Sequence, residues 1–254
     1  MARGVNSVLD TEYQYYLADT DEGKSIHFQL RYHVYCLRER FEDPKFFPDK
    51  EERDQHDDSS AHFLVRSRTT GDWLGGMRLI VDQARNLPVN NIASIDTANI
   101  AAVGTVKVAE ASRLCAILPD KRRPQSNGSS GPRNVHCESN SKHYRVLHAS
   151  VMTVGLIRAA RTYSLERGIV NCYFLINDPL ARILRHLGMG IDPVGDLCQH
   201  RGWRRPYHHN FETGYDQMER QSPELFGSFC TPPAYERFSK IDQPVDEMAL
   251  AINA

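Results

Sequence analysis

The sequence predicts an α/β domain in which helices cover the faces of a mixed β-sheet. Segments with helical periodicity alternate along the chain with segments of strand periodicity, as expected when helices pack on a sheet. The run IVNCYFLI (169–176) is apolar throughout, which is typical of a strand buried on both faces. No linker separates two apolar cores, so one domain is expected rather than two.

A helix is expected near the start of the chain, over SIHFQLRYHVYCLRERF (25–41). Apolar residues recur in it at helical spacing, and Thr20 and Asp21 offer N-caps in front of it. Arg31 and Tyr35 are four residues apart, so both side chains lie on one stripe of this helix.

The helix is followed by an acidic segment, in which six acidic residues fall between positions 49 and 58. Prolines on its N-terminal side predict a loop, and a stretch of this composition is most often solvated. Asp54 and Asp57 lie in it. Two interpretations are about equally supported: these residues belong to a functional site, or they form structural ion pairs with Arg31 or Arg78.

Two strands, AHFLVRSR (61–68) and WLGGMRLIVD (73–82), are expected to form a hairpin around the turn TTGD. The second strand contains Arg78. Its Gly-Gly pair indicates a bulge or the close approach of another group.

The next expected strand, over residues 106–117, contains VAEASRLCAI and looks like core except for Glu110 and Arg113. In a regular strand, side chains three residues apart point to opposite faces. Glu110 and Arg113 therefore meet in one cavity only if the strand bulges between them, around Ala111 and Ser112. Such a bulge would free backbone N–H groups to bind a carbonyl oxygen. The alternative is a structural ion pair at a strand edge.

The second half of the chain begins with a long loop, expected over 119–145 because Pro, Gly, Ser and Asn are abundant there. Helices are then expected over 146–167 and 177–188, with the apolar strand between them, and two last strands over 189–199 and 203–211. Between Lys121 and Arg145 the long loop is basic, with one acid against six cationic residues: Lys121, Arg122, Arg123, Arg133, Lys142 and Arg145.

Composition excludes several classes of function. The net charge of −1 does not favour nucleic acid or an anionic membrane as a partner. No run of about 18 apolar residues predicts a transmembrane helix. Six scattered cysteines without a CxxC pair predict reduced thiols in the cytoplasm. His200, His208 and His209 with Cys198 fit no standard zinc spacing, so no metal is expected.

Four short motifs occur in an order that resembles the acyltransferases of the autoinducer synthase and N-acyl amino acid synthase superfamily. They are RYHVYCLRERFEDP, ERDQHDDSSAHFLVR, GGMRLI and EASRLCAI. With a late RRPYHH, they look most like the branch called PEP-CTERM/exosortase system-associated acyltransferases, and the likeness covers roughly residues 12–230. It implies a GNAT-like domain over 12–215, with its sheet splayed at the fourth strand, followed by an acidic tail over 216–254 with a short helix near SPELFGSF.

The resemblance also implies the site. The matching acids and arginines of the autoinducer synthases are Arg31, Asp54, Asp57, Arg78, Glu110 and Arg113. We accordingly assign catalysis to Glu110, Ser112 and Arg113, and substrate binding to Arg31, Tyr35, Asp54, Asp57 and Arg78. The aromatic residue that those synthases place after the first helix is not clearly matched, so S-adenosylmethionine is not implied as a substrate.

The expected reaction is direct attack of an amine on an acyl thioester, with Glu110 as base and no further cofactor. Burial would raise the pKa of Glu110 and Arg113 would lower it, and the sequence leaves that balance open. The usual GNAT phosphate loop is absent, since NGSSG lies mid-loop, well before the next helix. The six basic residues of the long loop instead suit acyl carrier protein as donor, although acyl-coenzyme A stays open. The alternatives are an N-acyl homoserine lactone synthase and a non-catalytic sensor that binds acyl chains or carrier protein.

Overall fold

The structure, a computed structural model, describes residues 9–95, 107–118 and 136–241, and of residues 136–143 only the helical backbone. The strands of the sheet are β1 (Tyr13–Leu17), β2 (Ser60–Ser67), β3 (Trp73–Gln83), β4 (Lys107–Ala116), β5 (Asn171–Ile176), β6 (Asp192–Pro193), β7 (Cys198–Gln199), β8 (Trp203–Asn210) and β9 (Glu236–Arg237). The helices are α2 (Asp21–Arg31), α3 (Val89–Ile92), α5 (His136–Leu165), α6 (Asp178–His186), α7 (Asp216–Gln221) and α8 (Pro223–Cys230).

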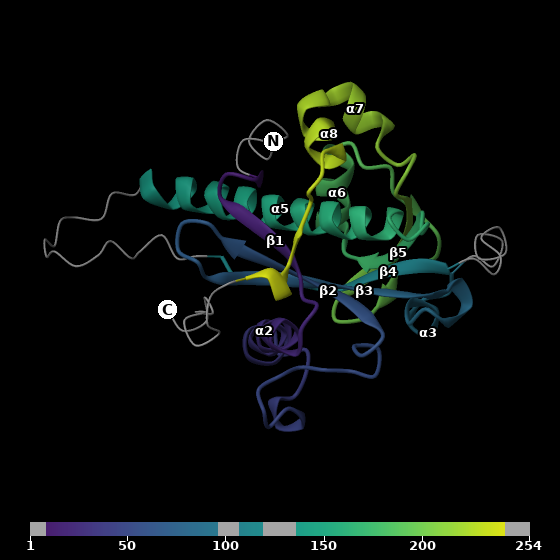
Figure 1. Cartoon of the computed structure of the whole chain (residues 1–254). Coiled ribbons are helices and arrows are strands. Elements are labelled where there is room, and N and C mark those ends of the chain that lie inside the picture. The colour runs from purple at the N-terminus through teal and green to yellow at the C-terminus, as the bar shows by residue number, and fades with distance from the viewer. Residues whose placement is uncertain (1–8, 96–106, 119–135, 242–254) are drawn as a thin grey trace, which may run out of the picture.

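The sheet is mixed and mostly antiparallel, in the order β6-β8-β5-β4-β3-β2-β1-β9, with β7 paired to β8. Among the pairs in that order, β4 with β5 and β1 with β9 are parallel. The long helix α5 lies across one face and α2 lies under the other, as Figure 1 shows. The predicted fold class, a mixed sheet with helices on both faces, is therefore confirmed.

Several elements differ from the sequence prediction. The strand expected over residues 189–199 is present only as the two-residue strands β6 and β7, and strand β1 was not predicted. The first helix is α-helical only to Arg31 and continues as a π-helix over Tyr32–Arg38. Its predicted N-cap is correct, since the Thr20 side chain accepts a hydrogen bond from the backbone N–H of Gly23. Helix α5 begins at His136, ten residues before the predicted start, inside the segment expected to be a loop.

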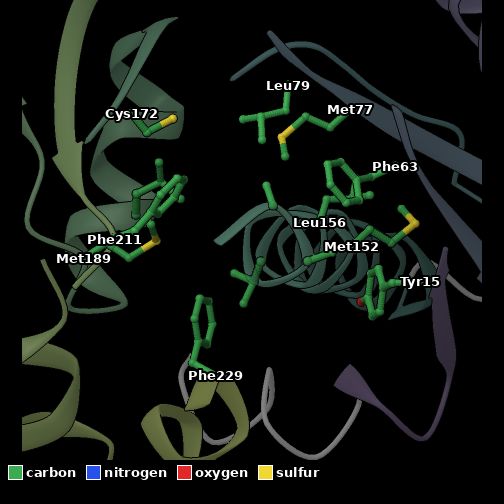
Figure 2. Close-up of a cluster of buried hydrophobic side chains, with 14 of the residues drawn as sticks. Tyr15, Phe63, Met77, Leu79, Met152, Leu156, Cys172, Met189, Phe211 and Phe229 are labelled. Atoms are coloured by element: carbon green, nitrogen blue, oxygen red, sulfur yellow. The ribbon is translucent and has the colours of Figure 1, made fainter. Parts of the chain in front are cut away.

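The main core lies between the sheet and α5. Met152 and Leu156 of α5 face Phe63, Met77 and Leu79 of the sheet, all of them buried (Figure 2). Burial of such side chains contributes about 1.5–3 kcal/mol each to the free energy of folding. This core therefore packs α5 firmly against the central strands of the sheet.

The segment after residue 215 packs on this core. Leu225 and Phe229 of α8, the short helix expected near SPELFGSF, are each 1% exposed. Strand β9 then pairs in parallel with β1 at the sheet edge. Among the described residues, no helix is long and apolar enough to span a membrane.

The Gly-Gly pair of β3 marks a close approach, as its sequence indicates. A Cβ atom on Gly76 would lie 2.5 Å from Cδ2 of His27 and 2.6 Å from the carbonyl oxygen of Phe63. The first neighbour belongs to α2 and the second to β2, so the missing side chain lets α2 sit directly on the sheet.

We predict that Gly76→Ala lowers the free energy of unfolding by about 1–3 kcal/mol, because the added methyl group overpacks the contact between α2 and β3. Urea denaturation measures the change. Gly227→Ala is the matched control, since a Cβ at Gly227, in helix α8, meets nothing within 4 Å. That change should be neutral or slightly stabilising. Equal stability of the two variants would contradict the close contact at Gly76.

Candidate active site

The sheet splays open between β4 and β5. The two strands pair only from Ala109 to Ala111 on β4 and from Cys172 to Phe174 on β5. Beyond these positions they diverge, and a cavity of about 730 Å³ opens between them. The predicted splay at the fourth strand is therefore present.

This first cavity is mainly apolar. The strand IVNCYFLI and the helix after it supply one wall through Phe174, Leu180 and Leu184. The other sides come from Leu114 and Ala116 of β4 and from Ala149, Thr153 and Ile157 of α5. A lining of this kind suits an alkyl chain, which gains free energy by leaving water.

A second cavity of about 440 Å³ meets the first. It is polar, and its charged lining residues are Asp54, Arg78, Glu110, Arg113, Arg201 and Arg204. The residues that line both cavities are Tyr35, Ala111, Ser112, Arg113, Leu175 and Arg204. The apolar and polar spaces therefore join at the splayed part of β4, where a group bound in one would reach the other.

A bulge in β4 lies at this junction. Ser112 pairs with Arg78 and Cys115 with Gly76, so Arg113 and Leu114 together oppose the single residue Met77. The bulge therefore lies one to two residues after the predicted position around Ala111 and Ser112. Arg113 has a φ of 53°, a left-handed conformation that costs a non-glycine residue free energy. This backbone reversal places the Arg113 side chain on the same cavity as Glu110.

Six buried or half-buried charged side chains form a closed ring of ion pairs at one side of the polar cavity. Arg31 pairs with Glu52 at 2.5 Å and with Asp57 at 2.6 Å. Arg78 pairs with Asp57 at 2.8 Å and with Asp54 at 2.5 Å. Arg113 completes the ring, with its Nη2 2.7 Å from Asp54 and 3.1 Å from Glu52. Every carboxylate thus bridges two guanidinium groups.

Glu52 is the member that sequence reasoning missed. It is 1% exposed and joins Arg31 to Arg113. It opens the motif ERDQHDD and lies in the acidic segment, so proximity to Asp54 and Asp57 was the available signal. Nothing in a single sequence distinguishes it from Glu51 beside it.

The ring divides the predicted substrate-binding residues into two groups. Asp54 and Arg78 line the polar cavity. Arg31 and Asp57 are 0% and 3% exposed and line neither cavity, so their assignment to substrate binding stays a prediction. Tyr35 lines both cavities, and its hydroxyl donates to the carbonyl oxygen of Leu114 at 3.0 Å. The π-helix that carries Tyr35 thereby braces the bulge.

Glu110 stands apart from the ring. Its carboxylate accepts a hydrogen bond from the backbone N–H of Val89 at 2.8 Å, and it forms no ion pair with Arg113, whose partners are Glu52 and Asp54. Burial raises the pKa of Glu110 to about 7, and Arg78 and Arg113 lower it only in part. Burial therefore outweighs the neighbouring arginines, which answers the question that the sequence left open.

Ser112 lies between Glu110 and Arg113 on β4. Its Oγ accepts a hydrogen bond from Nε of Arg78 at 3.2 Å, and the residue lines both cavities. Because that bond uses a lone pair, the hydroxyl hydrogen stays available to donate to a bound group.

The basic residues assigned to carrier-protein docking fall largely outside the described part of the chain. Lys121, Arg122, Arg123 and Arg133 lie in the segment 119–135, and the side chain of Lys142 is also outside it. Arg145 is exposed near the start of α5 and lines the apolar cavity.

Comparisons with known proteins agree with this fold. Residues 30–127 match the model of the acetyltransferase (GNAT) domain. The structure resembles the AHL synthase LasI at 17% identity, with a TM-score of 0.55 over 85% of this chain and 94% of that one. It also resembles BjaI, a CoA-dependent acyl-homoserine lactone synthase, at 16% identity and a TM-score of 0.55 over 96% and 99%. TofI in complex with an inhibitor and MTA gives 16% identity and 0.56 over 84% and 99%.

No curated protein matches the chain. The predicted GNAT-like fold is confirmed, and the matched domain indicates an acyltransferase type of enzyme. At identities below one fifth, the structural likeness itself establishes the fold.

We predict that Glu52→Gln destabilises the protein by about 3 kcal/mol, because two buried guanidiniums lose a shared carboxylate. Thermal and urea unfolding measure the effect. Glu39→Gln removes the partner of Arg38 in a pair whose side chains are 42% and 45% exposed, and should stay close to wild type. A mild effect at Glu52, equal to that at Glu39, would show that the ring contributes little.

The pKa of Glu110 predicts a pH dependence of stability. A carboxyl whose pKa rises from 4.5 unfolded to about 7 folded holds its proton more tightly in the native state. Stability therefore falls as pH increases from about 4.5 to about 7 and then levels off. Glu110→Gln keeps an oxygen for the Val89 N–H and removes the titration. The variant should gain stability relative to wild type over that range in urea titrations, and a constant difference would contradict the raised pKa.

Proposed function

We propose that this protein is an N-acyltransferase that moves a long fatty acyl group from a thioester to the amine of an amino acid or similar acceptor. The observation that carries the proposal is the junction of the two cavities at the β4 bulge. An acyl chain in the apolar cavity would place its thioester carbonyl beside Ser112 and Arg113. An amine in the polar cavity would approach the same carbon from the side of Glu110.

In this mechanism Glu110 removes a proton from the ammonium form of the acceptor, directly or through a water molecule. The free amine then attacks the thioester carbon, so that the C–N bond forms and the C–S bond breaks. The leaving thiolate takes the second proton that the nitrogen loses on becoming an amide, and Glu110 releases the first proton to water. A backbone N–H freed by the bulge and the Ser112 hydroxyl are the candidate donors to the tetrahedral oxyanion. No covalent acyl-enzyme is needed.

The donor is proposed to be acyl carrier protein. Its acidic surface suits the basic residues between Lys121 and Arg145. BjaI is CoA-dependent, so acyl-coenzyme A must be assayed beside it. The proposal places the enzyme in the cytoplasm, in keeping with the free thiols of the described cysteines. Membership of the PEP-CTERM/exosortase system-associated branch stays a prediction from the motifs.

The second candidate is an N-acyl homoserine lactone synthase, which the similarity to LasI and BjaI favours. It would use the same acyl cavity and a different acceptor. Mass spectrometry of lipid extracts from cells that express the protein separates the two, since one yields acyl amines or acyl amino acids and the other a lactone. The absence of any new acyl product, with an acyl chain or carrier protein still bound, would support a non-catalytic sensor instead.

We predict that Glu110→Gln lowers kcat by 10²–10⁴-fold, the range typical for loss of a general base. The assay follows thiol release from palmitoyl-carrier protein and palmitoyl-coenzyme A with a mixture of amino acids and amines. In the wild type, kcat/KM should rise about tenfold per pH unit below about 7 and then level off, because the carboxylate form is the base.

The exposed Glu212→Gln is the control and should leave both values unchanged. Full activity of Glu110→Gln with either donor would remove the base from the proposal. Absence of thiol release by the wild type with both donors would remove acyl transfer itself.

A further inference from the structure

The polar cavity contains a cation that the ring does not use. Arg204 comes from β8, on the far side of the splay from β4, and lines both cavities at their junction. It belongs to the motif RRPYHH, to which the sequence assigned no role in catalysis or binding.

The other arginines of the cavity all have carboxylate partners. Arg78 and Arg113 are held by the ring, and Arg201 pairs with Glu42. The sequence assigned substrate binding to Arg31 and Arg78 and catalysis to Arg113, but carboxylates already pair with all three guanidiniums. A new anion would have to displace a buried carboxylate to reach them.

Arg204 has no such partner among the described residues. Its Nη2 donates at 3.4 Å to the carbonyl oxygen of Arg201, and its Nε is buried with no hydrogen-bond partner in that part of the chain. A buried donor left unpaired costs about 1–3 kcal/mol, and more when it is charged. Burial, in turn, lowers the pKa of Arg204, although a guanidinium stays protonated in proteins. The Arg204 guanidinium is thus a charged hydrogen-bond donor without a carboxylate partner among the described residues.

A carboxylate is the ligand that fits it. The planar guanidinium presents parallel N–H donors that match the two oxygens of a carboxylate. Arg204 and Glu110 line the same cavity, so one small molecule can present an anionic group to the arginine and an amine to the base. An α-amino acid has both groups on one carbon, whereas a simple amine leaves Arg204 unpaired.

We propose that Arg204 determines acceptor specificity by binding the carboxylate of an amino acid whose amine is acylated. The inference rests on the proposed acyl transfer and goes beyond it by naming the residue that distinguishes amino acids from amines.

The test compares matched acceptors that differ only in the carboxylate: tyrosine with tyramine, phenylalanine with phenethylamine, leucine with isoamylamine and histidine with histamine. Thiol release from palmitoyl-carrier protein and palmitoyl-coenzyme A is measured with each. For the acceptors that are used, the wild type should favour the amino acid over its amine by about 10- to 100-fold in kcat/KM, the range for a hydrogen bond to a charged group.

Arg204→Gln should remove this preference by raising KM for the amino acid while leaving the amine nearly unchanged. Arg204→Lys should restore part of it, since the charge remains and the fork is lost. Arg205→Gln is the matched control, because Arg205 is the next residue of the same strand and lines neither cavity. Its preference should equal that of the wild type, and a folded Arg205→Gln shows that β8 tolerates the change.

Three results would overturn the proposal. The wild type could use amines as well as amino acids, or Arg204→Gln could keep the preference. A fall in kcat by the same factor for both members of each pair would instead make Arg204 a group that acts on the thioester. Absence of thiol release by the wild type with every acceptor overturns the acyl transfer on which the inference rests, and this outcome is distinct from the other three.

Discussion

The site is organised around one closed ring of three arginines and three carboxylates. The ring joins helix α2, the acidic loop, strand β3 and the bulge of β4, which are distant in sequence. Burying a charge is costly, and mutual pairing offsets that cost only when every partner is present. Each of the three carboxylates bridges two arginines, so these ion pairs hold the acidic loop in one conformation. The conformation of that loop in turn determines the shape of the polar cavity.

The loop has further support from buried histidines. Nε2 of His62 lies 3.0 Å from the carbonyl oxygen of Asp57, and Nδ1 of His62 lies 3.0 Å from Nδ1 of His27. A carbonyl oxygen only accepts, so Nε2 of His62 carries the hydrogen and its Nδ1 accepts from His27. Burial lowers the pKa of both histidines, which keeps them neutral beside the arginines. Behind the ring, Asp57 is therefore in contact with a chain of neutral, hydrogen-bonded histidines rather than with solvent.

Neutrality of the ring also shapes the chemistry beside it. Although burial raises the pKa of Asp54, the hydrogen bond and charge of Arg78 and the charge of Arg113 hold it below its usual value, so these positive charges are matched locally. Glu110 therefore experiences mainly its own burial, and its pKa rises to about 7. A carboxyl with that pKa is half-ionised near neutral pH, which suits a base that must accept and release a proton. Arg204, on strand β8, is the cationic residue of the polar cavity that has no carboxylate partner among the described residues.

The sequence by itself determined the alternation of helices and strands, the hairpin at TTGD and the buried apolar strand IVNCYFLI. These follow from local periodicity and turn chemistry, which a window of residues contains. Strand parity alone also required a bulge if Glu110 and Arg113 were to share a cavity, although it did not place the bulge at Arg113 and Leu114.

Only the tertiary structure decided which charges pair. The acidic segment reads as a solvated loop, yet Glu52 and Asp57 are nearly inaccessible, because residues far along the chain supply the arginines that make their burial tolerable. The pairing of Arg113 with Glu52 and Asp54, and the absence of a carboxylate partner for Arg204 among the described residues, depend on distances between strands. Neighbours in sequence do not set those distances. Ion pairing acts through space, so the roles of these residues appear only once the sheet has brought them together.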